Sequence, residues 1–320
     1  MLAMAGFVVA LMATPASAVT CSSADGTMSV DLAGGESITI SLGGGNDPRS
    51  IDVSPSDPSC GGFDTSNTST VRVNGGDGNE SVTINQAGSV PFPHQNTATI
   101  DLALGGGADV LLIIGQPTAD TIGLGGNGIS LDEGSTADVT GVGSIETLAV
   151  AAGGGDDTVS GKEGDDLGGD LGTPVAISGG EGNDALTGGT GNDVIGGGAG
   201  NDTLKGGKGN DSVDGGDGDD VVSGGGAQDS VSGGAGGDLL KGGGDRDSVD
   251  GGNGNDTGGG GGGPDNVLGG KGNDRIDGGA GDDHVMGEDG RDQLSGGKGN
   301  DHCQGGPDPD SITGCEHGRP

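Results

Sequence analysis

The chain has 320 residues, of which 82 are glycine, with no tryptophan, no tyrosine and only three phenylalanines. So few large side chains argue against a compact enzyme domain with an ordinary hydrophobic core. The formal net charge is −37 at pH 7, which excludes nucleic acid as a partner because phosphate binding needs clustered lysine and arginine. The same excess of carboxylates suits divalent cations.

Residues 1–18 are predicted to be a secretory signal peptide. An apolar run over residues 2–12 precedes the small-residue sequence ASA, which ends at Ala18 and is typical of a signal-peptidase site. We therefore expect cleavage after Ala18 and a mature chain that begins at Val19. The apolar run is too short to span a bilayer and no later segment is apolar enough, so we expect no transmembrane segment in the mature chain.

Four cysteines in a chain expected to be exported predict two disulfide bonds. They form two widely separated pairs, so Cys21–Cys60 and Cys303–Cys315 are the simplest of the three possible connectivities. A metal site is the alternative near the second pair, which two histidines flank, although no C-x-x-C spacing supports zinc.

Residues 19–151 are predicted to be an irregular β-rich region. Apolar residues alternate with polar ones in short segments, which is the period of a half-buried strand. Several segments run into glycine-rich turns that end in an acidic residue, such as Asp47 and Asp109, at uneven spacing. We expect an irregular parallel β-solenoid, and a small antiparallel sandwich is the alternative. The alternating segments are ITISL (38–42), VRV (71–73), VTI (82–84), IDLAL (100–104) and LAV (148–150).

A strict nonapeptide repeat fills the second half of the chain. From Gly179 to Thr313 the sequence divides into units of nine residues without an insertion or deletion, and degenerate units extend the register back to residue 152. The consensus is G-G-x-G-x-D-x-U-x, where U is aliphatic. The sixth residue is aspartate in every unit of the regular array, and Asp157 and Asp166 hold that position in the degenerate units.

The residue types at these positions point to cation binding. Glycine at positions one, two and four permits the positive φ of a tight turn and exposes carbonyl oxygens, and the sixth-position carboxylate is a hard anionic ligand of the kind that Ca²⁺ prefers. The x-U-x tripeptide predicts a very short strand whose middle side chain points inward. The predicted Ca²⁺ ligands are Asp157, Asp166, Asp184, Asp193, Asp202, Asp211, Asp220, Asp229, Asp238, Asp247, Asp256, Asp265, Asp274, Asp283, Asp292, Asp301 and Asp310.

The repeat closely resembles the RTX (repeats-in-toxin, haemolysin-type) calcium-binding nonapeptide. The resemblance implies an all-β fold with a right-handed parallel β-roll over residues 152–313, in which two nonapeptides form one 18-residue coil. It also implies calcium ions between neighbouring coils, each shared by aspartates 18 residues apart. Two interior columns of eighth-position side chains would follow: Leu186, Leu204, Val222, Leu240, Ile276, Leu294 and Ile312 in one, and Ile195, Val213, Val231, Val249, Val267 and Val285 in the other.

Some units depart from the consensus. Ala227, Asp245 and Asp308 replace the fourth-position glycine, Glu288 replaces a second-position glycine, and Gly258 leaves an inward position without a side chain. We expect calcium binding to be weakest near these residues. The aspartates of the last units are also expected to lack a partner coil.

Residues 314–320 are expected to form a C-terminal cap. Cys303 occupies an inward eighth position and Cys315 lies just past the last full unit. A bridge between them would close the open end of the roll and constrain the unfolded chain.

No motif of a known catalytic class accompanies the repeats: the sequence contains no H-E-x-x-H, G-x-S-x-G or P-loop pattern, and we expect no enzyme activity. The predicted function is that of an extracellular protein that folds on binding several Ca²⁺ ions and has a structural or adhesive role. Cell-surface or extracellular-matrix components are its candidate partners. The alternative is the calcium-dependent repeat portion of an exported hydrolase or toxin whose active part is absent or unrecognised.

Overall fold

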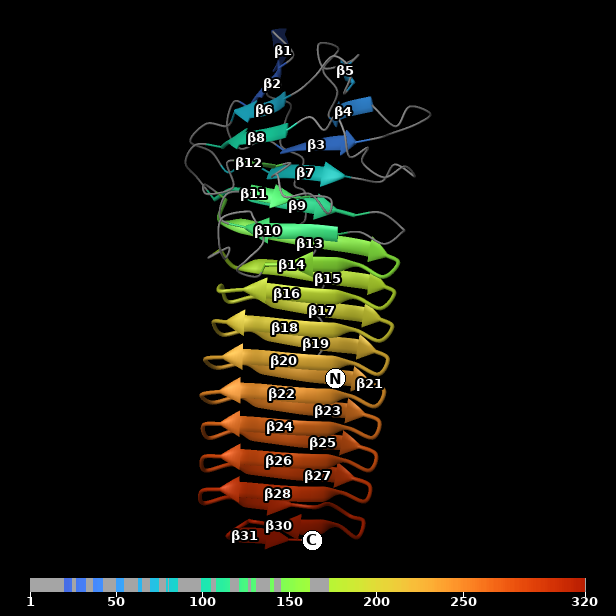
Figure 1. Ribbon diagram of the computed structural model, residues 1–320, viewed down its shortest axis with the longest axis vertical. Helices are drawn as coiled ribbons and strands as arrows, with labels where there is room; N and C mark the ends of the chain where they lie inside the picture. The colour runs from blue at the N-terminus through green and yellow to red at the C-terminus, as the bar shows by residue number, and fades with distance from the viewer. Residues whose placement is uncertain are drawn as a thin grey trace.

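The computed structural model is an all-β structure built from two long sheets. Among the described residues 31 strands form one sheet of 16 strands and one of 15, without any helix. Figure 1 shows the strands stacked along the long axis, from β1 (Thr20–Ala24) at one end to β30 (Ser311–Thr313) at the other. The structure describes residues 20–24, 27–32, 37–42, 50–54, 63–64, 70–74, 79, 81–85, 99–104, 108–115, 121–125, 128–130, 139–140, 145–161 and 173–319.

In the repeat region each coil of the chain contributes one strand to each sheet. A strand pairs in parallel with the strand two places further on, so that Leu186 lies beside Leu204, as the 18-residue coil predicts. The strands are β14 (Thr158–Ser160), β15 (Val175–Glu181), β16 (Ala185–Gly189), β17 (Val194–Ala199), β18 (Thr203–Lys208), β19 (Ser212–Asp217), β20 (Val221–Gly226), β21 (Ser230–Ala235), β22 (Leu239–Gly244), β23 (Ser248–Asn253), β24 (Thr257–Gly262), β25 (Asn266–Lys271), β26 (Arg275–Ala280), β27 (His284–Asp289), β28 (Gln293–Lys298), β29 (His302–Gln304), β30 and β31 (His317–Arg319).

Most of these strands are longer than the predicted tripeptide, so the predicted strand length was wrong for them. Most have six residues, and β18 runs through the glycine pair because Gly207 continues the pairing with Gly225 in the next coil. Side chains alternate between the two faces of a strand, so the first-position glycine points inward together with the aliphatic eighth residue. The roll therefore has a glycine row inside each sheet beside its aliphatic column.

The two predicted interior columns are confirmed. Their members pair in register along each sheet, and all are at most 3 % exposed except Ile312 at the open end, which is partly buried. Gly258 stands between Leu240 and Ile276 in its column without a side chain. Cys303 extends the other column beyond Val285.

The described strands of the N-terminal half continue the same two sheets. β9 pairs in parallel with β13, and β13 pairs in parallel with β15, so the parallel solenoid is confirmed and the antiparallel sandwich was wrong. Short antiparallel pairs occur at the ends of the sheets, such as β3 with β4, and also within the 16-stranded sheet, where β11 pairs with β10 and β12. The strands are β1, β2 (Thr27–Asp31), β3 (Ser37–Leu42), β4 (Ser50–Ser54), β5 (Phe63–Asp64), β6 (Thr70–Asn74), β7 (Ser81–Asn85), β8 (Thr99–Ala103), β9 (Val110–Ile114), β10 (Thr121–Gly125), β11 (Gly128–Ser130), β12 (Val139–Thr140) and β13 (Thr147–Gly154).

All five segments with the alternating pattern coincide with strands of this half, namely β3, β6, β7, β8 and β13, although Leu104 lies one residue past the end of β8. The pattern missed β9, whose sequence VLLII is apolar on both faces, because a search for alternation does not detect a strand of this kind. None of the described residues belongs to a helix of the length and apolarity needed to cross a membrane.

Candidate metal centre

The sixth-position aspartates form two rows along the roll. We call these rows ladders. Each aspartate of the first ladder directly precedes a strand of the 16-stranded sheet, and each aspartate of the second ladder directly precedes a strand of the 15-stranded sheet. From Asp184 to Asp301 every member is at most 3 % exposed, although an isolated buried charge is very unfavourable. The first ladder is Asp157, Asp184, Asp202, Asp220, Asp238, Asp256, Asp274, Asp292 and Asp310, and the second is Asp193, Asp211, Asp229, Asp247, Asp265, Asp283 and Asp301.

From Asp184 to Asp310, one oxygen of each ladder carboxylate accepts a hydrogen bond from the preceding coil. The backbone N–H of Asp211 donates to Oδ1 of Asp229 at 2.9 Å, and the N–H of Asp229 donates to Oδ1 of Asp247 at 2.9 Å. The same bond, 2.7–2.9 Å long, repeats along both ladders. Each carboxylate is therefore fixed in orientation by the coil before it.

The other oxygen has no such partner. From Asp184 to Asp310 every Oδ2 of the two ladders is buried and has no hydrogen-bond partner. It lies beside the first-position glycine: a Cβ added at Gly206 would collide with Oδ2 of Asp211 and would lie 2.6 Å from the carbonyl oxygen of Gly224. Glycine thus keeps open a space in which a carboxylate oxygen and a carbonyl oxygen from the next coil face each other.

Burial makes the negative charge of these carboxylates unfavourable. Desolvation raises the pKa of Asp229 to about 6; the N–H of Asp211 opposes the rise and the carboxylate of Asp211 adds to it. Burial likewise raises the pKa to about 6 at Asp193, Asp220, Asp247, Asp265 and Asp274. It raises the pKa in the same direction at Asp184, Asp202, Asp211, Asp238, Asp256, Asp283 and Asp292.

These oxygens fit Ca²⁺. The donors are carboxylate and carbonyl oxygens, the hard ligands that Ca²⁺ takes in flexible geometries, whereas zinc prefers sulfur and nitrogen. No group of three or more His, Cys, Asp or Glu side chains that could hold a metal occurs in the part of the chain that the structure describes. A cation between two coils would therefore take carboxylate oxygens from neighbouring ladder members and its remaining ligands from backbone carbonyls.

The structure places the first residues of the ladders differently from the sequence register. The register puts Asp166 beside Asp184, but Asp166 lies outside the described residues, and the N–H of Asp157 donates to Oδ1 of Asp184 at 2.8 Å across 27 residues. In the second ladder the place before Asp193 is held by Val175, whose N–H donates to Oδ1 of Asp193 at 2.9 Å. Asp193 therefore has a carboxylate neighbour one coil away on its C-terminal side only.

Two glutamates that sequence reasoning missed extend the second ladder. The N–H of Asp109 donates to Oε2 of Glu146 at 2.8 Å, and the N–H of Asp301 donates to Oε2 of Glu316 at 2.7 Å. Glu146 directly precedes β13 and Glu316 directly precedes β31, as each ladder aspartate precedes its strand. An acidic residue immediately before a short strand was the signal available in the sequence.

The fifth position, which the consensus leaves open as x, carries a second row of hydrogen bonds that sequence reasoning also missed. The N–H of Asn201 donates to Oδ1 of Asn183 at 2.8 Å, and the N–H of Asp219 donates to Oδ1 of Asn201 at 2.9 Å. These side chains accept from the following coil, whereas the ladder aspartates accept from the preceding one. Asparagine or aspartate occupies the fifth position in most units, which was the available signal.

Three of the four residues that replace a turn glycine keep the positive φ of the repeat, whereas Asp308 does not. Ala227, Asp245 and Glu288 have φ values of 75°, 69° and 73°, while the glycine at the second position of the Ala227 unit, Gly225, has 127°. A left-handed conformation costs a residue with a side chain about 1 kcal/mol. The weaker calcium binding expected near these residues remains a prediction.

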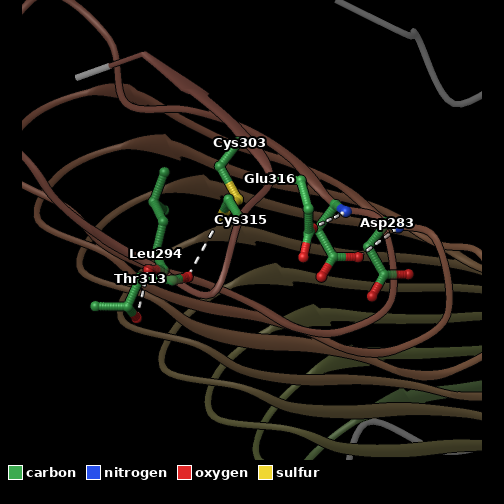
Figure 2. The surroundings of a disulfide bond; sticks show 7 residues. Asp283, Leu294, Cys303, Thr313, Cys315 and Glu316 are labelled. Atoms are coloured by element: carbon green, nitrogen blue, oxygen red, sulfur yellow. Dashed lines mark hydrogen bonds between the residues drawn. A yellow bond between two sulfur atoms is a disulfide. The ribbon is translucent and has the colours of Figure 1, made fainter.

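The predicted bridge between Cys303 and Cys315 is confirmed, with Cα atoms 6.0 Å apart (Figure 2). Cys303 is fully buried at the end of its interior column. Because both sulfurs are in the disulfide, the alternative in which they bind zinc is wrong. The other predicted bridge cannot be placed, since Cys60 lies outside the described residues.

A family model described as the RTX calcium-binding nonapeptide repeat matches the chain at residues 150–167, 176–204, 196–231, 223–258, 259–294 and 281–312. These segments carry both ladders, and the first of them includes the degenerate unit of Asp157. No curated protein sequence matches the chain.

Proposed function

Because residues 150–312 are an array of RTX calcium-binding nonapeptide repeats, we propose that this protein is a secreted calcium-binding β-roll that folds as Ca²⁺ binds along its two ladders. The observation that carries the proposal is the row of buried Oδ2 atoms from Asp184 to Asp310, each without a hydrogen-bond partner. Many of them lie beside a first-position glycine that also faces a carbonyl oxygen of the next coil. Bound Ca²⁺ would supply the positive charge that these carboxylates lack.

Folding and binding are coupled through the ladders. Stacking the coils buries one aspartate per nonapeptide, and burial together with like charge disfavours the ionised form, as in Asp229 and Asp247. A ligand that binds only the folded chain stabilises it by mass action. Since an inner aspartate has a carboxylate neighbour in the coil on either side, ordering one pair of coils positions the carboxylates for the next pair. We therefore expect folding to be steep in calcium concentration.

The test is a calcium titration of the mature chain, started in excess chelator and followed by circular dichroism and calorimetry. We expect little β signal in chelator and a cooperative gain as Ca²⁺ reaches about 10⁻⁴–10⁻³ M, the range of extracellular sites. Mg²⁺ is the matched control, because it is smaller, demands near-ideal octahedral geometry and keeps its water. A full β signal in chelator that Ca²⁺ leaves unchanged would refute the proposal.

Extracellular location is part of the proposal. Two observations support it: the leader-like pattern that ends at Ala18, and a disulfide bond, which persists in oxidising compartments. Mass spectrometry of the extracellular fraction should find an N-terminus at Val19. An intact Met1 in that fraction would contradict the proposal.

The shape of the roll supports a structural or adhesive role. The described strands of both halves extend the same two sheets along one axis (Figure 1), which makes a long rod with turns on both edges. We propose no enzyme activity of its own and take cell-surface or extracellular-matrix components as its partners. The alternative, a repeat portion that serves an exported hydrolase or toxin, predicts calcium-dependent hydrolytic or membrane-permeabilising activity in the secreted material.

A further inference from the structure

We propose that Glu316 closes the C-terminal end of the second ladder by supplying the carboxylate that completes its last calcium site with Asp301. The inference rests on the proposed function and adds a ligand residue that lies outside the nonapeptide pattern. It also gives the disulfide bond next to Glu316 a role in calcium binding.

The hydrogen bonding of the ladder identifies the place of Glu316. Each member donates its N–H to the carboxylate of the next coil, and the N–H of Asp283 donates to Oδ1 of Asp301 at 2.9 Å over 18 residues. At the next step the regular spacing would reach Arg319, which has no carboxylate. The N–H of Asp301 instead donates to Oε2 of Glu316 at 2.7 Å over 15 residues.

Strand register explains the shorter step. β31 pairs in parallel with β29, and His302 is aligned with His317. Glu316 therefore precedes its strand as Asp301 precedes its own, and the last coil is three residues shorter than the 18 of a regular coil. The backbone thus places a glutamate at the ladder position that the repeat itself does not reach.

Asp301 has the features of an inner ladder member. It is fully buried, and its Oδ2 has no hydrogen-bond partner. A Cβ added at Gly296 would lie 2.8 Å from this Oδ2 and would collide with the carbonyl oxygen of Gly314. Asp301 therefore has a carbonyl oxygen of the following coil beside its Oδ2, as Asp211 has, together with a carboxylate at the next ladder position.

The first ladder ends differently, which provides an internal comparison. β30, the strand that Asp310 directly precedes, is the last strand of the 16-stranded sheet among the described residues, so no described strand of a following coil lies beyond it. The prediction that the last aspartates lack a partner coil thus agrees with the surroundings of Asp310 and not with those of Asp301. Only the second ladder is closed by an acidic residue beyond the repeats in the described residues.

The disulfide bond holds the closing segment against the roll. It joins Cys303, two residues after Asp301, to Cys315, the residue before Glu316, and Figure 2 shows both cysteines and Glu316 together at the end of the row of carboxylates. Chain ends fray unless they are tied down. The bridge therefore keeps Glu316 near Asp301 at the end of the 15-stranded sheet, where β31 is the last described strand.

The test compares the mature wild-type chain with Glu316→Gln, which keeps an oxygen acceptor but loses the charge, and with Glu316→Ala. Glu181→Gln, at an exposed position of the first regular unit, is the matched control. Hydrogen exchange measured across a calcium titration reports each region separately. We expect the calcium midpoint for protection of residues 293–316 to rise about tenfold in both Glu316 variants, as for other interactions that support a bound metal. Residues 206–232 and the control should not change.

Reduction tests the role of the bridge. Dithiothreitol supplies two electrons and two protons, which convert the disulfide to the thiols of Cys303 and Cys315 while the reagent forms its cyclic disulfide. We expect reduction to raise the midpoint of residues 293–316 in the wild type and to add little in Glu316→Gln, because the two changes act on one interaction.

Each outcome decides the question. A midpoint in Glu316→Gln within twofold of wild type overturns the inference, and so does a shift found only in Glu316→Ala, which would leave Glu316 a hydrogen-bond acceptor alone. Failure of residues 293–316 of Glu316→Gln to regain protection in saturating calcium also overturns it, since the role would then be structural. If no region of the wild-type chain responds to calcium, the proposed function itself fails.

Discussion

Asp229 and Asp193 form a matched pair for testing whether each calcium ion is shared between coils. Both belong to the second ladder, both accept a backbone N–H at 2.9 Å, and burial raises the pKa of each to about 6. Asp229 has carboxylate neighbours on both sides, Asp211 and Asp247, whereas Asp193 has Val175 on one side. Replacement by asparagine removes the charge and keeps the Oδ1 acceptor.

The expected magnitudes follow from mass action. A site with a dissociation constant of about 10⁻⁴–10⁻³ M contributes about 1.4–2.7 kcal/mol of stability at ~10 mM calcium. Asp229→Asn affects two sites and should lower the free energy of unfolding in calcium by about 3–5 kcal/mol. Asp193→Asn affects one site and should lower it by about half as much.

Without calcium the effect should reverse. A carboxylate whose pKa rises from 3.8 in the unfolded chain to about 6 in the fold destabilises the fold by about 3 kcal/mol at neutral pH. Asparagine removes that cost, so both variants should show at least as much β signal in chelator as the wild type.

The assay is urea unfolding in calcium, followed by circular dichroism, with the β signal in chelator measured alongside. Asp217→Asn, at the exposed last residue of β19, is the control and should change neither quantity. Equal losses in Asp229→Asn and Asp193→Asn would refute the sharing of ions between coils. A loss of β signal in chelator would refute the electrostatic argument.

Three further predictions concern the same roll. The ladder aspartates have a raised pKa in the fold, so their protonation favours folding below about pH 4, and this stability is lost as the pH rises through about 6. Circular dichroism in chelator should therefore show β structure gained on acidification. A β signal that does not change with pH would contradict this. Gly206→Ala should abolish the calcium site at Asp211, because the new Cβ collides with Oδ2, whereas Gly226→Ala, with nothing within 4 Å, should keep wild-type stoichiometry in calorimetry. Gly258→Ala should raise the free energy of unfolding in calcium by about 1 kcal/mol. The added Cβ would contact only movable side chains, the nearest being Ile276 at 3.1 Å. A free energy of unfolding below that of the wild type would show that the interior column has no room for the methyl group.

The sequence by itself determined the repeating part of this protein. In a solenoid each coil contacts only its neighbours, so a strict period of nine residues is enough to align Leu186 with Leu204 and Asp211 with Asp229. The same local rule placed Cys303 at an inward position within reach of Cys315, at the end of the array, where the bridge forms.

Only the tertiary structure decided the partners at the ends and in the irregular half. The N–H of Asp157 donates to Asp184 across 27 residues, whereas the register of the repeat predicts a neighbour 18 residues away. Glu316 joins the second ladder because the last coil is shortened. In both places the alignment of two strands depends on the number of residues in the segment that connects them. The residue pattern within a strand does not specify that number. Sequence periodicity therefore specifies which side chains point inward, and strand pairing specifies which of them meet.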